Sequence, residues 1–152
     1  MGRIIGLDFG SKTVGVAVSD PMKVIASPLE TIVRDRESKM RPTYRRILEI
    51  ASQTEAEIIV VGDPVNMDGS RGERAEKSAA FAEELRYRLE CEGMDIPVVM
   101  WDERLTTISA DEILSEAEVA VKDRKTYIDK IAAAFILEDW MKNNRKEEEK
   151  NG

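Results

Sequence analysis

Residues 1–33 contain three β-rich segments with no helical spacing between them, and this feature restricts the fold more than any other. The segments are Arg3–Phe9, Val14–Asp20 and Val24–Val33, and a short glycine-containing turn joins the first two. Connections of this length join neighbouring antiparallel strands. Pro28 removes a backbone donor from the third segment, so we expect that strand at a sheet edge or a bulge.

From residue 39 onward, helical spacing alternates with short apolar runs. Tyr44, Ile47, Leu48 and Ala51 recur on one helix face, which predicts a helix over Lys39–Thr54. The apolar run Ile58–Val61 has no polar alternation, which is typical of a strand buried on both faces of a parallel sheet. The other expected elements are a strand over Glu57–Gly62, a loop over Asp63–Ser70, a helix from Ser70 to about Glu92, a strand over Ile96–Trp101, a short helix near Ser109–Glu112, a polar loop over Glu118–Lys125 and a helix over Thr126–Asn143.

This order predicts an α/β fold with a mixed five-stranded sheet. The first three strands form an antiparallel meander, and the two later strands, each reached through a helix, join in parallel by right-handed crossovers. Helices then cover both faces of the sheet. A length of 152 residues suits one domain. We expect that domain over residues 1–144, followed by a charged, flexible tail at residues 145–152.

The composition removes several classes of chemistry. The chain has no histidine and one cysteine, Cys91, which excludes Ser-His-Asp and Cys-His catalysis and an internal disulfide, and disfavours a zinc site. The net charge of −7 does not by itself favour nucleic-acid binding. Locally, Arg34, Arg36, Lys39, Arg41, Arg45 and Arg46 face only Asp35 and Glu37. Without a signal peptide or a membrane-spanning run, we expect a cytoplasmic protein.

Asp8 is the most unusual residue of the first predicted strand. A carboxylate in a central strand must be paired, hydrogen-bonded or metal-bound, because burying it alone is costly. It is either a functional acid or a structural aspartate that accepts N–H bonds from the Gly10–Lys12 turn. The first strand alone leaves both interpretations open.

Two further acidic positions are equally out of place. Asp102 and Glu103 follow an apolar strand, at the end where open α/β sheets bind ligands, although they also suit a turn or a helix cap. Asp129 shares a helical stripe with apolar residues, but Thr126–Asp129 equally fits a capped helix start. The other members of the stripe are Ala132, Ala133, Ile136, Leu137 and Trp140.

An acid from the first strand, one from a later parallel strand and one from the last helix can converge on one point. Three carboxylates within a few ångströms repel one another unless cations lie between them. An all-oxygen site suits Mg²⁺ or Mn²⁺. Two such ions can activate a water and stabilise the leaving oxygen in phosphodiester cleavage without any histidine. The acids therefore favour a two-ion site for hydrolysis of nucleic acid.

Four sequence blocks resemble the bacterial YqgF/RuvX family in their order and spacing. They are Gly6–Ala17, Val61–Ser70, Asp102–Thr107 and Ile128–Ala133, and together they span nearly the whole chain. The resemblance implies an RNase H-like fold related to Holliday-junction resolvases. It also implies a metal-dependent nuclease, described for the family as acting in 5′-end maturation of pre-16S rRNA.

The resemblance also assigns roles to individual residues. Asp8, Glu103 and Asp129 correspond to the catalytic, metal-binding acids, and Asp102 is the alternative at the second position. Candidate substrate contacts are Lys12, Asn66, Ser70, Arg71, Arg74 and Arg104. The Asn66–Ser70 loop would offer backbone amides to a phosphate, or would simply be a well-capped turn. The basic residues would contact phosphates, or be ordinary surface cations.

Asp63 departs from the family pattern, in which a leucine usually precedes the proline of this loop. An additional acid there would bind metal, repel phosphate or face solvent. The departure concerns loop geometry and substrate affinity rather than the fold.

Other functions fit parts of the sequence. The strand–Asp–turn motif also occurs in ATP-binding proteins of the actin–Hsp70–sugar-kinase type, but these enclose a nucleotide between two lobes and this chain supplies one. A resolvase of branched DNA, or a nucleic-acid-binding module with little catalysis, would carry the same motifs. Structured RNA is the favoured partner and branched DNA the alternative, and both a monomer and a homodimer remain open.

Overall fold

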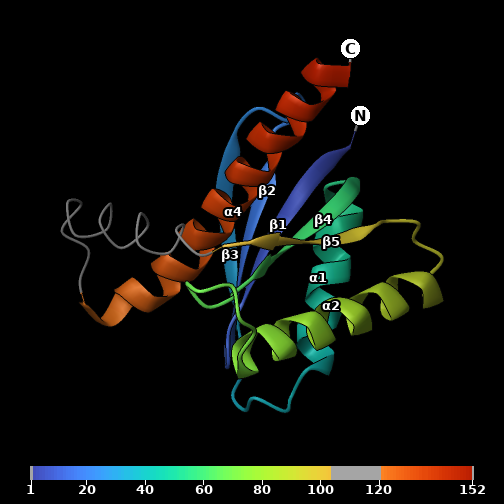
Figure 1. Ribbon diagram of the computed structural model, residues 1–152. Coiled ribbons are helices and arrows are strands. Elements are labelled where there is room, and N and C mark those ends of the chain that lie inside the picture. The colour runs from blue at the N-terminus through green and yellow to red at the C-terminus, as the bar shows by residue number, and fades with distance from the viewer. Residues whose placement is uncertain (1, 104–120, 152) are drawn as a thin grey trace.

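A five-stranded sheet forms the centre of the protein in a computed structural model that describes residues 2–103 and 121–151 (Figure 1). The strands are β1 (Arg3–Phe9), β2 (Thr13–Ser19), β3 (Ala26–Val33), β4 (Ala56–Asp63) and β5 (Val98–Asp102), in the spatial order β3-β2-β1-β4-β5. β1, β2 and β3 are antiparallel neighbours, whereas β4 runs parallel to both β1 and β5. The predicted mixed sheet is confirmed, and Pro28 lies on the edge strand β3.

Helices cover both faces of this sheet, as the sequence order predicts (Figure 1). The helices are α1 (Arg41–Gln53), α2 (Glu73–Cys91) and α4 (Val121–Asn151). Alternate residues of one strand enter two separate cores: Ile59 and Val61 of β4 pack with α1 and α2, and Val60 packs with α4. β4 is thus buried on both faces, which explains its continuous apolar run.

The apolar stripe predicted for the last helix is confirmed. Ala132, Ala133, Ile136 and Leu137 are fully buried against the sheet, and Trp140 packs at the margin of the same core. The helix itself is longer than predicted. It begins at Val121, so residues 121–125 are helical and the polar loop predicted there is wrong. The backbone of residues 145–151 also continues α4, and the division of the chain at residue 144 stays a prediction.

The early start of α4 overturns the capping interpretation of Asp129. Thr126 lies inside the helix, and Asp129 follows more than two turns after Val121. A carboxylate there is too far from the helix start to cap it. Asp129 therefore needs another reason to lie on the packing face of α4.

The Ser70–Glu73 segment has the Ser-x-x-Glu spacing of a capping box, which predicts a helix start at Ser70, and this prediction is wrong. The helix begins at Glu73 rather than Ser70, and its N-cap, Gly72, makes no side-chain capping bond. The Ser70 backbone N–H and hydroxyl both donate to Asp68 Oδ1 instead, at 2.9 and 2.6 Å. The local Asp68–Ser70 turn thus replaces the helical turn that the spacing predicts.

Asp20 shortens the third strand at its start. Its Oδ1 accepts the backbone N–H groups of Val24 and Ile25, at 2.7 and 2.9 Å, and holds both residues in the β2–β3 turn. Strand β3 begins only at Ala26 for this reason. The short helix predicted near Ser109–Glu112 lies outside the described residues. Among the described helices, none is long and apolar enough to cross a membrane.

Candidate active site

Two glycines, Gly6 and Gly15, let α4 approach the sheet closely. A Cβ on Gly15 would overlap the backbone carbonyl of Asp129, and one on Gly6 would lie 2.8 Å from the Ala133 carbonyl oxygen. Gly15 pairs directly with Asp8 across the β1–β2 ladder. Because residues paired in this way point to the same face, the side chain of Asp8 faces α4. The missing Cβ of Gly15 thus brings the Asp129 backbone directly over the strand next to Asp8.

Glu103 reaches the same place from β5. Its backbone N–H donates to the Asp63 carbonyl oxygen at 3.2 Å, which ties the residue after β5 to the end of β4. Its carboxylate then lies over Gly62, where a Cβ would collide with Oε2. The carboxyl groups of Asp8 and Glu103 share a hydrogen bond. The predicted convergence of acids at the carboxyl ends of parallel strands is thus present for this pair, while Asp102 is exposed.

Burial and mutual repulsion disfavour negative charge in this cluster. Desolvation, and then the charge of Asp129, raise the pKa of Asp8 from 3.8 to about 7. The hydrogen bond with Glu103 and the charge of Arg74 lower this pKa, but by less. Desolvation, and then the charge and hydrogen bond of Asp8, raise the pKa of Glu103 from 4.5 to about 8, and Asp63 adds to this shift. Three acids this close therefore favour a proton or a cation between them.

The donor set fits a hard divalent cation. Asp8, Glu103 and Asp129 offer carboxylate oxygens only, which Mg²⁺ and Mn²⁺ prefer. Within residues 2–103 and 121–151, no group of three acids is already drawn together as tightly as metal ligands are. Asp8 and Glu103 are in contact through their hydrogen bond, and Asp129 is close enough to act on Asp8 by its charge.

The turn after Asp8 does not use this carboxylate as a backbone acceptor. The Gly10 N–H donates to the Thr13 carbonyl oxygen at 2.7 Å, so the turn closes on its own backbone. Desolvation, Asp129, Glu103 and Arg74 are the influences on the pKa of Asp8, and no backbone donor is among them. The described residues thus do not support a structural Asp8 that caps the Gly10–Lys12 turn.

One of the predicted substrate cations, Arg74, lies beside the acids, and another, Lys12, lies on the turn that follows β1. Arg74, in the first turn of α2, donates Nη2 to the Phe9 carbonyl oxygen at 3.2 Å, and its charge lowers the pKa of both Asp8 and Glu103. Lys12 is exposed on the β1–β2 turn that directly follows Asp8 and Phe9. Arg104 lies outside the described residues.

The Asn66–Ser70 loop is closed by its own hydrogen bonds. Asn66 Nδ2 donates to Ser70 Oγ at 3.0 Å, and the Asn66 backbone N–H donates to the Ser70 carbonyl oxygen at 2.9 Å. Met67 at the same loop is exposed. This network matches the alternative of a well-capped turn, and the predicted phosphate contact of Asn66 and Ser70 stays a prediction.

Asp63, the departure from the family pattern, does not face solvent. Its Oδ2 pairs with Arg71 Nη1 at 2.7 Å, and its Oδ1 is buried without a hydrogen-bond partner in the described residues. Arg71 also contacts Glu76 and donates to the Ala75 carbonyl oxygen. The predicted phosphate contact of Arg71 would therefore compete with three partners within the protein.

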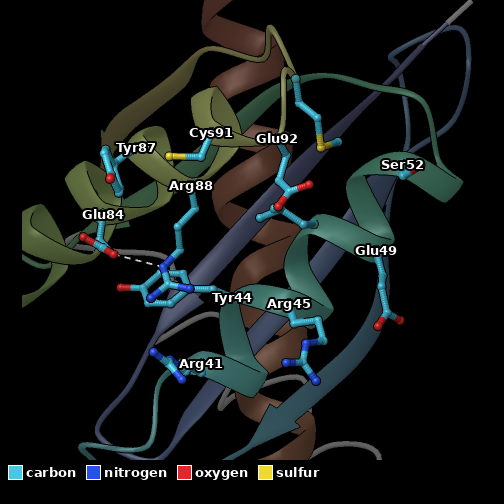
Figure 2. A pocket seen from close by; sticks show the side chains of 12 residues that line it. Arg41, Tyr44, Arg45, Glu49, Ser52, Glu84, Tyr87, Arg88, Cys91 and Glu92 are labelled. Carbon is cyan, nitrogen blue, oxygen red and sulfur yellow. Dashed lines mark hydrogen bonds and ion pairs between the residues drawn. The ribbon is translucent and has the colours of Figure 1, made fainter.

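A separate groove between α1 and α2 lies on the face of the sheet opposite α4 and has a volume of about 870 Å³ (Figure 2). Figure 2 shows the Arg88 guanidinium over the Tyr44 ring, 4.5 Å from its centroid, and joined to Glu84. The charged residues that line it are Arg41, Arg45, Arg88, Glu49, Glu84 and Glu92. Three cations against three anions give this groove no excess of positive charge, and none of the three converging acids lines it.

Comparison with known proteins agrees with this geometry. The family model described as "RuvX: Holliday junction resolvase" matches residues 2–143. The chain belongs to this family. It is 50% identical over 144 residues to a protein of Lachnospira eligens named "Putative pre-16S rRNA nuclease", with 95% of this chain and 99% of that protein covered. A protein of the same name from Listeria innocua is 49% identical over 139 residues, covering 91% of this chain and 96% of the relative.

The fold of this RuvX-family chain is RNase H-like. The solved structure of T. thermophilus RuvC in complex with a Holliday junction substrate matches with a TM-score of 0.56 and 16% identity, covering 94% of this chain and 96% of RuvC. At this identity the likeness concerns the fold alone. The predicted family and fold are thus both confirmed.

Sequence reasoning missed two features that position the acids. The first is the set of glycines that α4 packs against. The sequence could have indicated Gly15, because it lies opposite Asp8 in the predicted hairpin. The second is Arg34, which the sequence groups with surface cations but which is only 4% exposed. Nothing in the local sequence distinguishes Arg34 from its exposed neighbours.

Proposed function

We propose that this chain is a divalent-metal-dependent endonuclease that hydrolyses phosphodiester bonds at the 5′ end of pre-16S rRNA. The observation that supports this proposal is the approach of Asp8, Glu103 and Asp129 from three different elements, with Asp8 and Glu103 sharing a hydrogen bond. Acids held this close have no evident structural purpose, because their repulsion and desolvation oppose folding.

In this proposal Asp8, Glu103 and Asp129 hold Mg²⁺ or Mn²⁺, with two ions as the expected number. Ions in such a site activate a water and stabilise the leaving oxygen of the phosphodiester. A bound cation would hold the Asp8 and Glu103 carboxyls in their charged form, because carboxyl groups bind metal as carboxylates. The exposed Lys12, and Arg74 beside the acids, contact the nucleic-acid backbone in this proposal.

The substrate class rests on the relatives. Those reported above are named for pre-16S rRNA, cover nearly the whole chain and are about half identical to it. We therefore favour structured RNA, and we infer that the protein acts in the cytoplasm, where ribosomal RNA precursors are processed.

Cleavage of branched DNA is the second candidate. The family model carries the description Holliday junction resolvase, and the fold is that of RuvC. A resolvase that cuts a symmetric junction is expected to work as a symmetric dimer. Sedimentation of the protein with and without a four-way DNA junction tests this requirement directly.

The deciding experiment compares two substrates with one protein. Purified protein is incubated with a pre-16S rRNA 5′ fragment and with a four-way DNA junction, each with Mg²⁺, Mn²⁺ or EDTA. We expect metal-dependent cleavage of the RNA, and at least about a 1,000-fold loss in Asp8→Asn, Glu103→Gln and Asp129→Asn, as for removal of groups that act as a unit. Asp95→Asn, which removes an exposed acid on the loop before β5, is the matched control and should cleave like the parent.

The alternatives predict different results. Cleavage of the junction alone would favour the resolvase. Binding without cleavage by the parent would identify a nucleic-acid-binding module with little catalysis. Equal cleavage by the parent and by Asp8→Asn would contradict a nuclease that works through these acids. Calorimetric titration with Mg²⁺ adds a readout independent of turnover, because the acid variants should lose binding that Asp95→Asn keeps.

A further inference from the structure

Arg34 is a buried cation that the proposed chemistry does not yet use. It directly follows β3 and is only 4% exposed. Its Nη2 donates to the carbonyl oxygens of Gly10 and Ser11, at 2.7 and 2.6 Å, and its backbone N–H donates to the Lys12 carbonyl oxygen at 2.7 Å. Three consecutive carbonyls of the β1–β2 turn therefore converge on one residue.

This arrangement is costly for the fold. Nε and Nη1 of Arg34 are buried and have no hydrogen-bond partner in the described residues. Glu37, the acid whose charge acts on Arg34, forms its ion pair with Lys77 at 2.9 Å instead. Burying a guanidinium without a carboxylate to pair with it opposes folding, because the lost hydration is not replaced. Such a cost suggests that the shape of the turn itself matters.

The contacts of Arg34 determine which way the turn amides point. No peptide bond in the described chain is cis. In a trans peptide the N–H points opposite to the preceding carbonyl. Because the carbonyls of Gly10 and Ser11 point toward Arg34, the N–H groups of Ser11 and Lys12 point away from it.

The direction away from Arg34 is the direction of the acids. The Arg34 guanidinium lies over the Phe9 ring, 5.1 Å from its centroid. That ring stacks on Phe81 of α2, so Arg34 and Phe9 belong to the α1–α2 face of the sheet. Asp8 precedes Phe9 in the same strand and therefore points to the opposite face. The amides of Ser11 and Lys12 are thus turned toward the face that carries Asp8.

We propose that the Gly10–Lys12 turn binds a backbone phosphate of the nucleic-acid substrate, and that Arg34 is the positioning residue that orients its amides. Adjacent N–H groups with a common direction form a concave anion site, and the exposed Lys12 ammonium adds a full positive charge. The phosphate held here neighbours the one that is cut, because the turn follows Asp8 after a single residue. This inference rests on the proposed nuclease function and adds a substrate contact to it.

The direct test observes the amides of the unaltered protein. The ¹⁵N-labelled full chain, in EDTA, is titrated first with inorganic phosphate and then with a short RNA oligonucleotide. We expect the amide protons of Ser11 and Lys12 to move downfield and to saturate together with binding. If RNA binds while these two amides stay in place, the phosphate site is refuted.

Variants separate orientation from charge. Arg34→Met should raise KM about tenfold while kcat changes by less than about threefold, because charge-assisted bonds to a phosphate away from the reacting atoms contribute to binding. Arg34→Lys should recover part of this loss, since an ammonium can still donate to the carbonyls. Lys12→Ala should reduce the salt dependence of RNA binding by about one phosphate contact and leave the Ser11 shift intact.

Arg46→Gln is the matched control. It removes another arginine from the same basic segment. The ion-pair partners of Arg46 are Glu30 and Glu49, which lie away from the Gly10–Lys12 turn. A KM for Arg34→Met equal to that of Arg46→Gln, with Arg34→Met folded by circular dichroism, would overturn the proposal. If Arg34→Met does not fold, the amide titration of the parent still decides. Phosphate shifts without any RNA cleavage by the parent would support the phosphate site and contradict the nuclease, so the two failures are distinguishable.

Discussion

Replacement of Gly15 by alanine tests whether the approach of α4 to the sheet creates the site. The new Cβ would lie 2.7 Å from the Lys130 backbone nitrogen and closer still to the Asp129 carbonyl, whereas ordinary contacts are 3.4 Å or longer. Both obstacles are backbone atoms, so no rotamer change relieves them. The helix must therefore retreat by about 1 Å or more, because a packed interior has no room elsewhere.

This displacement has two measurable effects. Overpacking of this kind costs about 1–3 kcal/mol in the free energy of unfolding, which for a chain of this size lowers Tm by roughly 3–10 °C. Asp129 moves away from Asp8 with its helix. A misplacement of about 1 Å in a catalytic group reduces the rate by about 100-fold. We therefore expect a folded protein with a much larger loss of activity than of stability.

The assay combines urea unfolding, cleavage of the pre-rRNA fragment with Mg²⁺, and the rise in Tm on adding Mg²⁺. Ile50→Val is the matched control, because it removes one methylene from the core on the opposite face and costs about 0.5–1.5 kcal/mol. It should keep both its activity and its Mg²⁺-dependent stabilisation. Cleavage by Gly15→Ala at a rate near that of Ile50→Val would refute the reasoning that Gly15 positions Asp129.

The remaining predictions concern the charges and contacts around the acids. The folded-state pKa values of Asp8 and Glu103 lie above their ordinary values, so the metal-free protein should lose stability as pH rises from about 4 to about 8. Asp8→Asn should remove much of this loss. In urea unfolding with EDTA at pH 8, the variant should be more stable than the parent by as much as about 4 kcal/mol. A less stable Asp8→Asn at pH 8 would contradict this account. Asp63→Leu removes a charge that raises the pKa of Glu103, so that pKa should fall, and ¹³C NMR of the metal-free protein should detect the change; an unchanged pKa would exclude the influence of Asp63. Asp139→Ala removes the acceptor that lies 2.7 Å from the Trp101 Nε1–H group. We expect the free energy of unfolding to fall by about 1–3 kcal/mol, with little effect on kcat. A large loss of kcat would mean that this bond also holds the acids in place.

The sheet was predictable because its signals are periodic and independent. The apolar run of β4 and the stripe of α4 each reflect burial over many residues, so no single residue decides them. The acids Asp8 and Asp129 stood out because each interrupts such a pattern. Helix starts were less predictable, since the mostly polar sequences at 121–125 and 70–73 fit a helix or a loop about equally, and packing further along the chain decides between them.

The contacts that align the site depend on tertiary structure, and no local pattern contains them. Arg34 resembles its neighbours in sequence, and only the fold shows that it lies under the turn at Gly10 and Ser11. The ion pair of Asp63 with Arg71 likewise joins residues from a strand end and a loop. The glycines under α4 were visible as residues, but the proximity of the helix backbone was not.

The continuity of α4 limits how this chain can vary in length. Asp129 lies beside the strand that carries Asp8, and Asp139 of the same helix accepts the bond from Trp101 of β5. Asp139 follows Asp129 by ten positions of unbroken helix, a span of about 15 Å. One inserted residue would rotate everything beyond it by about 100° and shift it by about 1.5 Å, so the acid and the strand contact could not both keep their places. Insertions and deletions between Asp129 and Asp139 should therefore be poorly tolerated, whereas the exposed β2–β3 turn should accept them more readily.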